Sequence, residues 1–88
     1  MEFSVYILLS EKCKRTYVGQ TQDLDSRLKL HNAGRVRSTK RCLPWKMIYR
    51  EKCSSRSKAT ERELWLKTRS GRRFIKQLLD HTESWQNG

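Results

Sequence analysis

The chain has 88 residues, with 20 Lys and Arg against 9 Asp and Glu, which gives a formal net charge of +11. This length predicts a single domain with a small core. The charge predicts a polyanionic partner, nucleic acid first and an anionic membrane surface second, with general solubility as the simpler alternative. No apolar run reaches the ~20 residues of a membrane span, and the first residues lack a signal-peptide pattern, so we expect a cytoplasmic protein.

The cysteines predict neither a zinc site nor a disulfide framework. Cys13, Cys42 and Cys53 are odd in number, and none stands at the C-x2-C spacing of a zinc ligand pair. No base is recognisably placed beside any of them, so a cysteine nucleophile is not indicated. We therefore expect reduced thiols.

The N-terminal segment predicts a β-hairpin. Residues 3–9 show the period-two alternation of a strand, residues 10–14 form a polar turn, and residues 16–18 run back as a second strand. The turn chemistry alone does not fix how the two strands are aligned.

One register makes a specific prediction for two tyrosines. If Leu9 pairs with Lys14, Tyr6 lies opposite Tyr17, and the two share a face under any register shift of an even number. A tyrosine pair that only packs across the strands is the alternative.

The next segment predicts a helix with two cations on its inner face. Asp23 can cap the N-terminus, and Gly34 suits the left-handed position after the C-terminus. Helical spacing from Leu24 places Arg27 and His31 in the apolar stripe, where a cation needs a partner or an opening to water. The alternative is that Arg27 reaches the surface while His31 is a hydrogen-bonded core residue.

Residues 35–43 predict a basic loop with four positive charges in its first seven positions. Pro44 ends the loop, and the alternation of residues 45–50 predicts a third strand. Ser38, Thr39 and the loop arginines are groups that hold phosphate oxygens, although the loop could also be a solvated connector.

A second helix is predicted at roughly residues 57–69, with Glu63 inside its apolar stripe. A carboxylate in that position is costly unless it is paired or binds a cation. Two structural alternatives compete: a capping box from Thr60 to Glu63, and an ion pair from Glu63 to Lys67.

The C-terminal part predicts a third helix and a tail. Ser70 and Gly71 are expected to end the second helix, and four apolar residues predict the amphipathic helix that follows: Phe74, Ile75, Leu78 and Leu79. We expect a domain over residues 1–80 and a frayed tail over 81–88, in which Trp85 could dock back. The predicted fold is therefore a small α/β sandwich in the order β-β-α-β-α-α, with a three-stranded antiparallel sheet.

These positions also carry a family resemblance. The chain resembles the GIY-YIG endonuclease family, most closely its small stand-alone branch and less closely the nuclease module of the bacterial excision-repair incision subunit, which implies a role in DNA repair. The resemblance covers about residues 3–80 and rests on five segments: Tyr6, Tyr17-Val18-Gly19, Arg27 to Gly34, Pro44-Trp45-Lys46 and Ala59 to Lys67. The chain lacks the Gly-Ile before the first tyrosine, and Ile75 stands where some relatives have an asparagine.

The resemblance implies a metal-dependent nuclease that hydrolyses DNA with an activated water. Glu63 would hold one divalent ion, Mg2+ or Mn2+, with waters completing the shell. Arg27 would bind the scissile phosphate, and Tyr6 would take the proton of the water while Tyr17 orients it. His31 would lower the barrier for a phenol that is otherwise a poor base at pH 7.

Nucleic acid is the expected partner, DNA before RNA, with an additional protein for targeting left open. Gly19 would let backbone approach the site. The residues expected to contact the nucleic-acid backbone are Arg35, Arg37, Thr39, Lys40, Arg41, Arg72 and Arg73. The alternative function is a non-catalytic nucleic-acid-binding module on the same scaffold. A membrane-surface protein is disfavoured because no helix combines a broad apolar face with a purely basic one.

Overall fold

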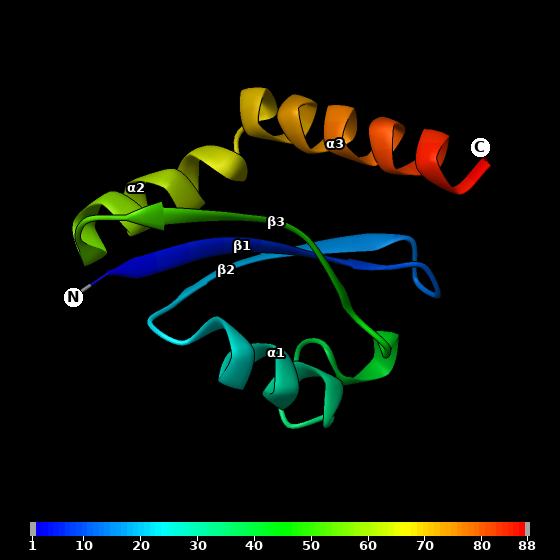
Figure 1. Cartoon of the computed structure of the whole chain (residues 1–88), viewed down its shortest axis with the longest axis horizontal. Helices are drawn as coiled ribbons and strands as arrows, with labels where there is room; N and C mark the ends of the chain where they lie inside the picture. The colour runs from blue at the N-terminus through cyan, green and yellow to red at the C-terminus, as the bar shows by residue number, and fades with distance from the viewer. Residues whose placement is uncertain (1, 88) are drawn as a thin grey trace.

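The computed structural model describes residues 2–87, and of residues 81–87 only the backbone. The elements are β1 (Phe3–Ser10), β2 (Arg15–Thr21), α1 (Leu24–Asn32), the short 3-10 turn η1 (Lys40–Cys42), β3 (Lys46–Cys53), α2 (Arg56–Leu66) and α3 (Arg69–Asn87). Their order is the predicted β-β-α-β-α-α (Figure 1), so the predicted α/β fold is confirmed. No helix in the described part of the chain is long and apolar enough to cross a bilayer.

The sheet separates two small cores. Its strand order is β2-β1-β3, with both neighbours antiparallel to β1. Helix α1 lies on one face, and α2 and α3 lie on the other (Figure 1). Because successive side chains of β1 point to opposite faces, Val5 and Ile7 pack under α2 and α3, while Tyr6 and Leu8 pack toward α1. The central strand therefore supplies both cores.

The register of the hairpin differs from the expected one by two residues. Tyr6 pairs with Gly19, and Tyr17 pairs with Leu8, because the four-residue turn sits one position later than expected and ends at Lys14 in the left-handed conformation. A shift of two leaves the faces unchanged. The Tyr6 and Tyr17 rings accordingly lie on one face with their centroids 6.3 Å apart, which confirms the shared face.

The expectation that all thiols are reduced is wrong for two of the three cysteines. Cys13 in the hairpin turn and Cys42 in η1 form a disulfide across 29 positions of sequence. The Ser10 hydroxyl donates to the Cys42 carbonyl at 2.6 Å, so the hairpin turn and η1 are also joined by a buried hydrogen bond. Cys53 is a free, partly buried thiol. Local cysteine spacing could not reveal the pair, because only the tertiary fold brings the two segments together.

The boundary between the last two helices also differs from the prediction. Helix α2 ends at Leu66, and α3 begins at Arg69, so Gly71 lies in the first turn of α3 and does not end α2. A Cβ at position 71 would collide with the Trp65 carbonyl oxygen, so the glycine permits a close approach between helices. The expected frayed tail is helical to Asn87. Docking of Trp85 falls outside the described side chains.

Candidate active site

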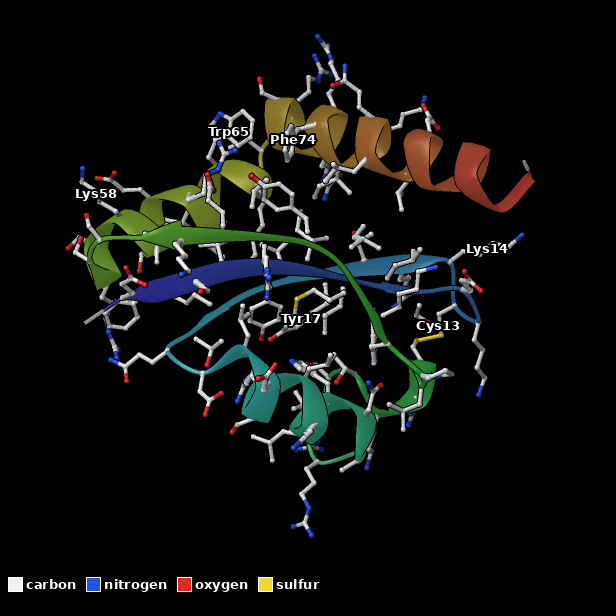
Figure 2. The ribbon with its side chains drawn as sticks, viewed as in Figure 1. Cys13, Lys14, Tyr17, Lys58, Trp65 and Phe74 are labelled. Atoms are coloured by element: carbon white, nitrogen blue, oxygen red, sulfur yellow. A yellow bond between two sulfur atoms is a disulfide. The ribbon has the colours of Figure 1, made fainter. Side chains whose placement is uncertain are left out.

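Four side chains from three elements meet on the α1 face of the sheet. Tyr6 comes from β1, Tyr17 from β2, and Arg27 and His31 from α1. The Tyr6 hydroxyl lies 3.2 Å from His31 Nε2, and Arg27 Nε donates to the same hydroxyl at 3.4 Å. The Tyr17 and His31 rings meet edge to face, with centroids 4.9 Å apart. Figure 2 shows the Tyr17 ring between the sheet and α1.

The capped start of helix α1 and its helical spacing bring Arg27 and His31 to this point. The Asp23 carboxylate accepts from the Ser26 backbone N–H at 3.2 Å, which fixes the first turn as predicted. Arg27 and His31 are four residues apart and so lie one above the other on the face toward the sheet. His31 is fully buried, and Arg27 is half-buried.

A buried threonine sets the hydrogen-bonding state of the histidine. The Thr39 hydroxyl donates to the Val36 carbonyl at 3.3 Å, so the Thr39 oxygen accepts the N–H of His31 Nδ1 at 2.9 Å. From this pairing we infer that the proton of the neutral imidazole resides on Nδ1. We infer that Nε2 carries the free lone pair and accepts the proton of the Tyr6 hydroxyl.

This role removes Thr39 from the residues that the sequence predicted to contact the nucleic-acid backbone. Its side chain is 1% exposed, and its hydroxyl is used by His31 and Val36, so it is not retained among the phosphate contacts. The Trp45 indole N–H donates to the Thr39 carbonyl at 2.8 Å and holds this part of the loop in place.

Burial and charge set the protonation states of the site. Burial raises the pKa of Tyr6 above its ordinary value of 10.0, and the hydrogen bond from Arg27 acts in the opposite direction. Burial, followed by the positive charge of Arg27, lowers the pKa of His31 below 6.5. The imidazole is therefore neutral at pH 7 and able to accept a proton, whereas the phenol is protonated.

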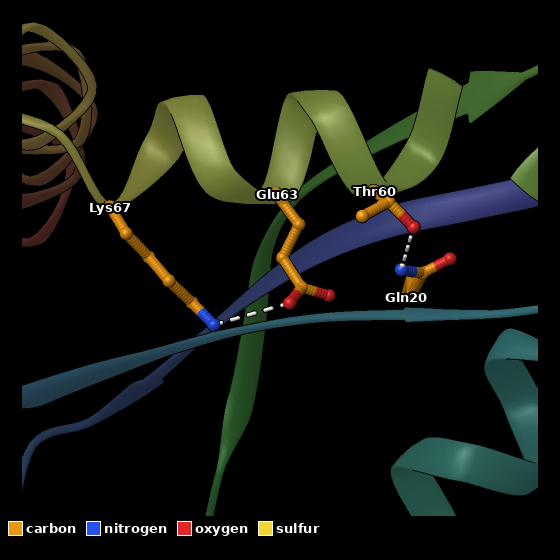
Figure 3. Close-up of polar contacts among 4 residues, drawn as sticks. All are labelled: Gln20, Thr60, Glu63 and Lys67. Atoms are coloured by element: carbon orange, nitrogen blue, oxygen red, sulfur yellow. Dashed lines mark hydrogen bonds and ion pairs between the residues drawn. The ribbon is translucent and has the colours of Figure 1, made fainter. Parts of the chain in front are cut away.

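Glu63 comes from α2, which covers the face of the sheet opposite α1 (Figure 1), and its side chain reaches toward the edge strand β2 (Figure 3). Helix α2 begins at Arg56 under a Ser55 cap, so the capping box at Thr60, one of the two structural alternatives, is not formed. Figure 3 shows the Glu63 and Lys67 side chains extending from α2 toward β2, with Lys67 Nζ donating to the Glu63 carboxylate at 3.1 Å. The Glu63 side chain is 20% exposed, and its charge contributes to the raised pKa of Tyr6.

Gly19 provides the space that the two tyrosines occupy. A Cβ on Gly19 would lie 2.6 Å from the Tyr6 hydroxyl oxygen and 3.0 Å from a ring carbon of Tyr17. Any side chain at this position would displace the phenol. The sequence predicted that Gly19 lets backbone approach the site, and the structure adds that the missing side chain leaves room for the two tyrosine rings.

The side chains at the site fit a metal ion whose coordination shell is completed by waters and a substrate phosphate. Among the described residues, no three His, Cys, Asp or Glu side chains come together as a metal cage. Glu63 is one carboxylate facing the sheet edge, and Mg2+ commonly uses one or two carboxylates with waters and a substrate phosphate. The residues present therefore fit Mg2+ or Mn2+ held by Glu63, waters and a phosphate.

The basic residues lie on two separate surfaces. Arg35, Arg37, Lys40 and Arg41 are exposed on the loop after α1. Both Arg72 and Arg73 are exposed on α3, but only Arg72 lines a groove beside β2. The sequence treated these two arginines as equivalent, and the structure separates them.

Two further residues hold the site together in a way that the sequence did not predict. The Asn32 side-chain oxygen accepts from the Trp45 backbone N–H at 2.7 Å, and the Asn32 amide donates to the Trp45 carbonyl at 3.0 Å. The end of α1 is thereby fixed to the start of β3. Both residues belong to recognised motif segments, and that was the only sequence signal that they have a role.

Comparison with known proteins agrees with this geometry. The family model described as the GIY-YIG catalytic domain matches residues 2–77. A UPF0213 protein of Staphylococcus haemolyticus is 38% identical over 77 residues, which cover 84% of this chain and 90% of that protein. The solution NMR structure of a UPF0213 protein of Bacillus halodurans is similar, with a TM-score of 0.53, 28% identity, and coverage of 89% of this chain and 85% of that one.

The chain belongs to the GIY-YIG family, as its motifs predicted. Both relatives are matched over most of their own length, which is consistent with the small stand-alone branch. Membership of this family suggests nuclease activity and nucleic-acid binding.

Proposed function

We propose that this protein is a metal-dependent nuclease that hydrolyses phosphodiester bonds in DNA. The observation that carries the proposal is the Tyr6 hydroxyl, which contacts a neutral histidine nitrogen and an arginine at the same time. A hydroxyl between a proton acceptor and a cation is suited to proton transfer beside a phosphate. A tyrosine that only packs in a core needs neither contact.

The proton transfer would run from the attacking water to Tyr6 and from Tyr6 to His31. Tyr6 Oη takes a proton from the attacking water while its own proton passes to His31 Nε2, so the phenol never has to ionise in advance. This relay avoids the cost that the raised pKa of Tyr6 would otherwise impose. Because His31 must be neutral, the rate should fall as the pH drops through its pKa, which lies below 6.5.

The phosphate would be bound between α1 and α2. Arg27 is already oriented by the Tyr6 hydroxyl and would neutralise the charge that develops on the phosphoryl oxygens. Glu63 would exchange its ion pair with Lys67 for the divalent ion. A bound Mg2+ would supply further neutralisation of that charge and of the departing 3′ oxygen.

A cleavage assay on a panel of DNA structures tests the function directly. Purified protein is incubated with single-stranded, nicked, branched and duplex DNA, with Mg2+ or Mn2+ and in parallel with EDTA. We expect cleavage of at least one substrate that requires the ion. Binding without cleavage of any substrate, under conditions in which the protein is folded, would instead identify the non-catalytic binding module.

Substitution of Thr39 tests the proton relay. Thr39→Val keeps the shape but leaves the N–H of His31 Nδ1 without an acceptor, so the imidazole loses its preferred tautomer. Cleavage should fall at least about tenfold, while DNA binding is unchanged. Nitrogen NMR shifts of His31 should report a proton that has moved toward Nε2.

The matched control for this substitution is Thr39→Ser, which keeps the hydroxyl and should restore most of the rate. The acid limb of the pH–rate profile should stay below pH 6.5 in the wild type and in this control. If Thr39→Val cleaves at the wild-type rate with the tautomer unchanged, the threonine has only a packing role.

A further inference from the structure

A groove follows the free edge of β2 away from the candidate active site. One hollow lies between β2 and the end of α2, and a second lies between the hairpin turn and α3. Both are lined by Thr16, Arg72 and Ile75, so the two hollows adjoin, and we call them together the β2 groove. It begins at Tyr17 and Lys67, one helical turn from Glu63, and ends at Lys14 in the hairpin turn.

The rim of the β2 groove is basic. Lys14 and Arg15 lie on the β2 side, and Arg72 and Lys76 lie one turn apart on α3, all four exposed. Arg15, Arg72 and Lys76 take part in none of the ion pairs formed by the described side chains. The groove therefore presents positive charge that the described part of the protein leaves uncompensated, which is what a polyanion requires.

The floor of the β2 groove is apolar. Four apolar side chains line it, of which Val18 and Leu79 are partly exposed, whereas Leu66 and Ile75 are buried. A duplex stacks its bases inside and presents only phosphates, so it would leave this floor uncovered. A single strand can turn its bases onto the floor while its phosphates meet the rim.

We propose that the β2 groove binds single-stranded nucleic acid that flanks the scissile phosphate. This inference deepens the proposed nuclease function and rests on it for the position of the scissile bond. From Gly19 to Arg15 the strand advances four residues, about 13 Å, so the groove can hold a short stretch of an extended single strand. The β2 groove would therefore select DNA that has a single-stranded segment, such as a flap or a branch.

Two double variants of equal charge separate the groove from general electrostatics. Arg15→Glu with Arg72→Glu reverses both sides of the rim. Lys29→Glu with Lys58→Glu reverses two exposed cations that do not line the groove and are not among the expected nucleic-acid contacts. Figure 2 shows Lys58 at the opposite end of the molecule from Lys14. Lys29 lies on α1, across the sheet from α3 (Figure 1), so the two variants are matched in charge and exposure but differ in position.

Binding is measured by fluorescence anisotropy with a 15-nucleotide oligothymidine and with a blunt duplex, in EDTA so that no cleavage is needed. The groove variant should weaken oligothymidine binding at least about tenfold and reduce the slope of log K against log salt by about 1.4, for two lost contacts. The control variant should change both far less, and duplex binding should respond equally to the two variants.

An equal loss of oligothymidine binding in both variants would overturn the proposal in favour of net charge, and a loss confined to duplex would overturn the single-strand assignment. Circular dichroism checks folding, and Arg15→Gln with Arg72→Gln replaces the groove variant if the reversal unfolds the chain. Because binding is measured without divalent ions, a groove effect with no cleavage in the metal assay would reject the nuclease and keep the groove. Cleavage with no groove effect would keep the nuclease and reject the groove.

Discussion

Arg27→Ala is expected to abolish detectable DNA cleavage. The guanidinium is the cation that contacts the Tyr6 hydroxyl, at 3.4 Å, and no other cation is within hydrogen-bonding distance of that hydroxyl among the described side chains. Without it the charge on the phosphoryl oxygens is left uncompensated at the point where the proton moves, which should cost several kcal/mol of transition-state stabilisation, a loss of a thousandfold or more. Single-turnover cleavage with excess protein measures this loss apart from binding.

Lys29→Ala is the matched control for Arg27→Ala. It removes one positive charge from the exposed face of the same helix and should leave the cleavage rate close to that of the wild type. Both variants should keep the circular dichroism spectrum of the wild type. If Arg27→Ala unfolds the protein, Arg27→Lys is used, because it keeps the charge but not the planar guanidinium. An Arg27 variant that is folded and cleaves normally would leave this residue with a structural role.

Glu63→Gln is expected to reduce cleavage at least about a hundredfold while DNA affinity in low salt stays the same or rises. The substitution keeps the volume of the side chain and removes the charge that would hold the ion. Raising the Mg2+ concentration should recover part of the rate, because the remaining ligands would be the phosphate and waters. Cleavage rates over a Mg2+ titration, in both proteins, measure this.

The ion pair with Lys67 gives a competing account of Glu63, and it predicts a different result. An i,i+4 pair on a helix contributes about 0.2–0.5 kcal/mol to stability and nothing to the reaction. Glu61→Gln removes an exposed carboxylate two positions earlier on α2 and is the control for charge. If Glu63→Gln loses only this much stability and cleaves like Glu61→Gln, Glu63 is a surface ion-pair residue and the assignment as a metal ligand fails.

The sequence predicted the elements of the fold and the side chains that meet in the site. Period-two alternation located the strands, and the four-residue spacing of Arg27 and His31 placed both on the inner face of α1. These are local properties, fixed by backbone geometry over a few residues. The shared face of Tyr6 and Tyr17 was also predictable, because an error of two in the register does not change it.

What the sequence could not give are contacts between segments far apart in the chain. Thr39 looked like a surface residue in a basic loop, and only its packing against α1 shows that it holds the His31 ring. The predicted end of α2 was wrong because glycine is common just after a helix, whereas Gly71 here lets α3 approach the Trp65 carbonyl. The difference between Arg72 and Arg73 likewise depends on which side of α3 faces β2.

The bond between Cys13 and Cys42 has a topological consequence for the site. It closes a covalent ring across 29 positions, and this ring contains β2, α1 and the basic loop. Tyr17, Arg27, His31 and Thr39 are therefore tethered to one another even in the unfolded chain, which by loop-closure entropy favours folding by roughly 3 to 4 kcal/mol. Of the residues proposed to act in catalysis, Tyr6 and Glu63 lie outside the ring, so in the oxidised protein assembly of the site brings β1 and α2 onto a segment that is already closed into a loop.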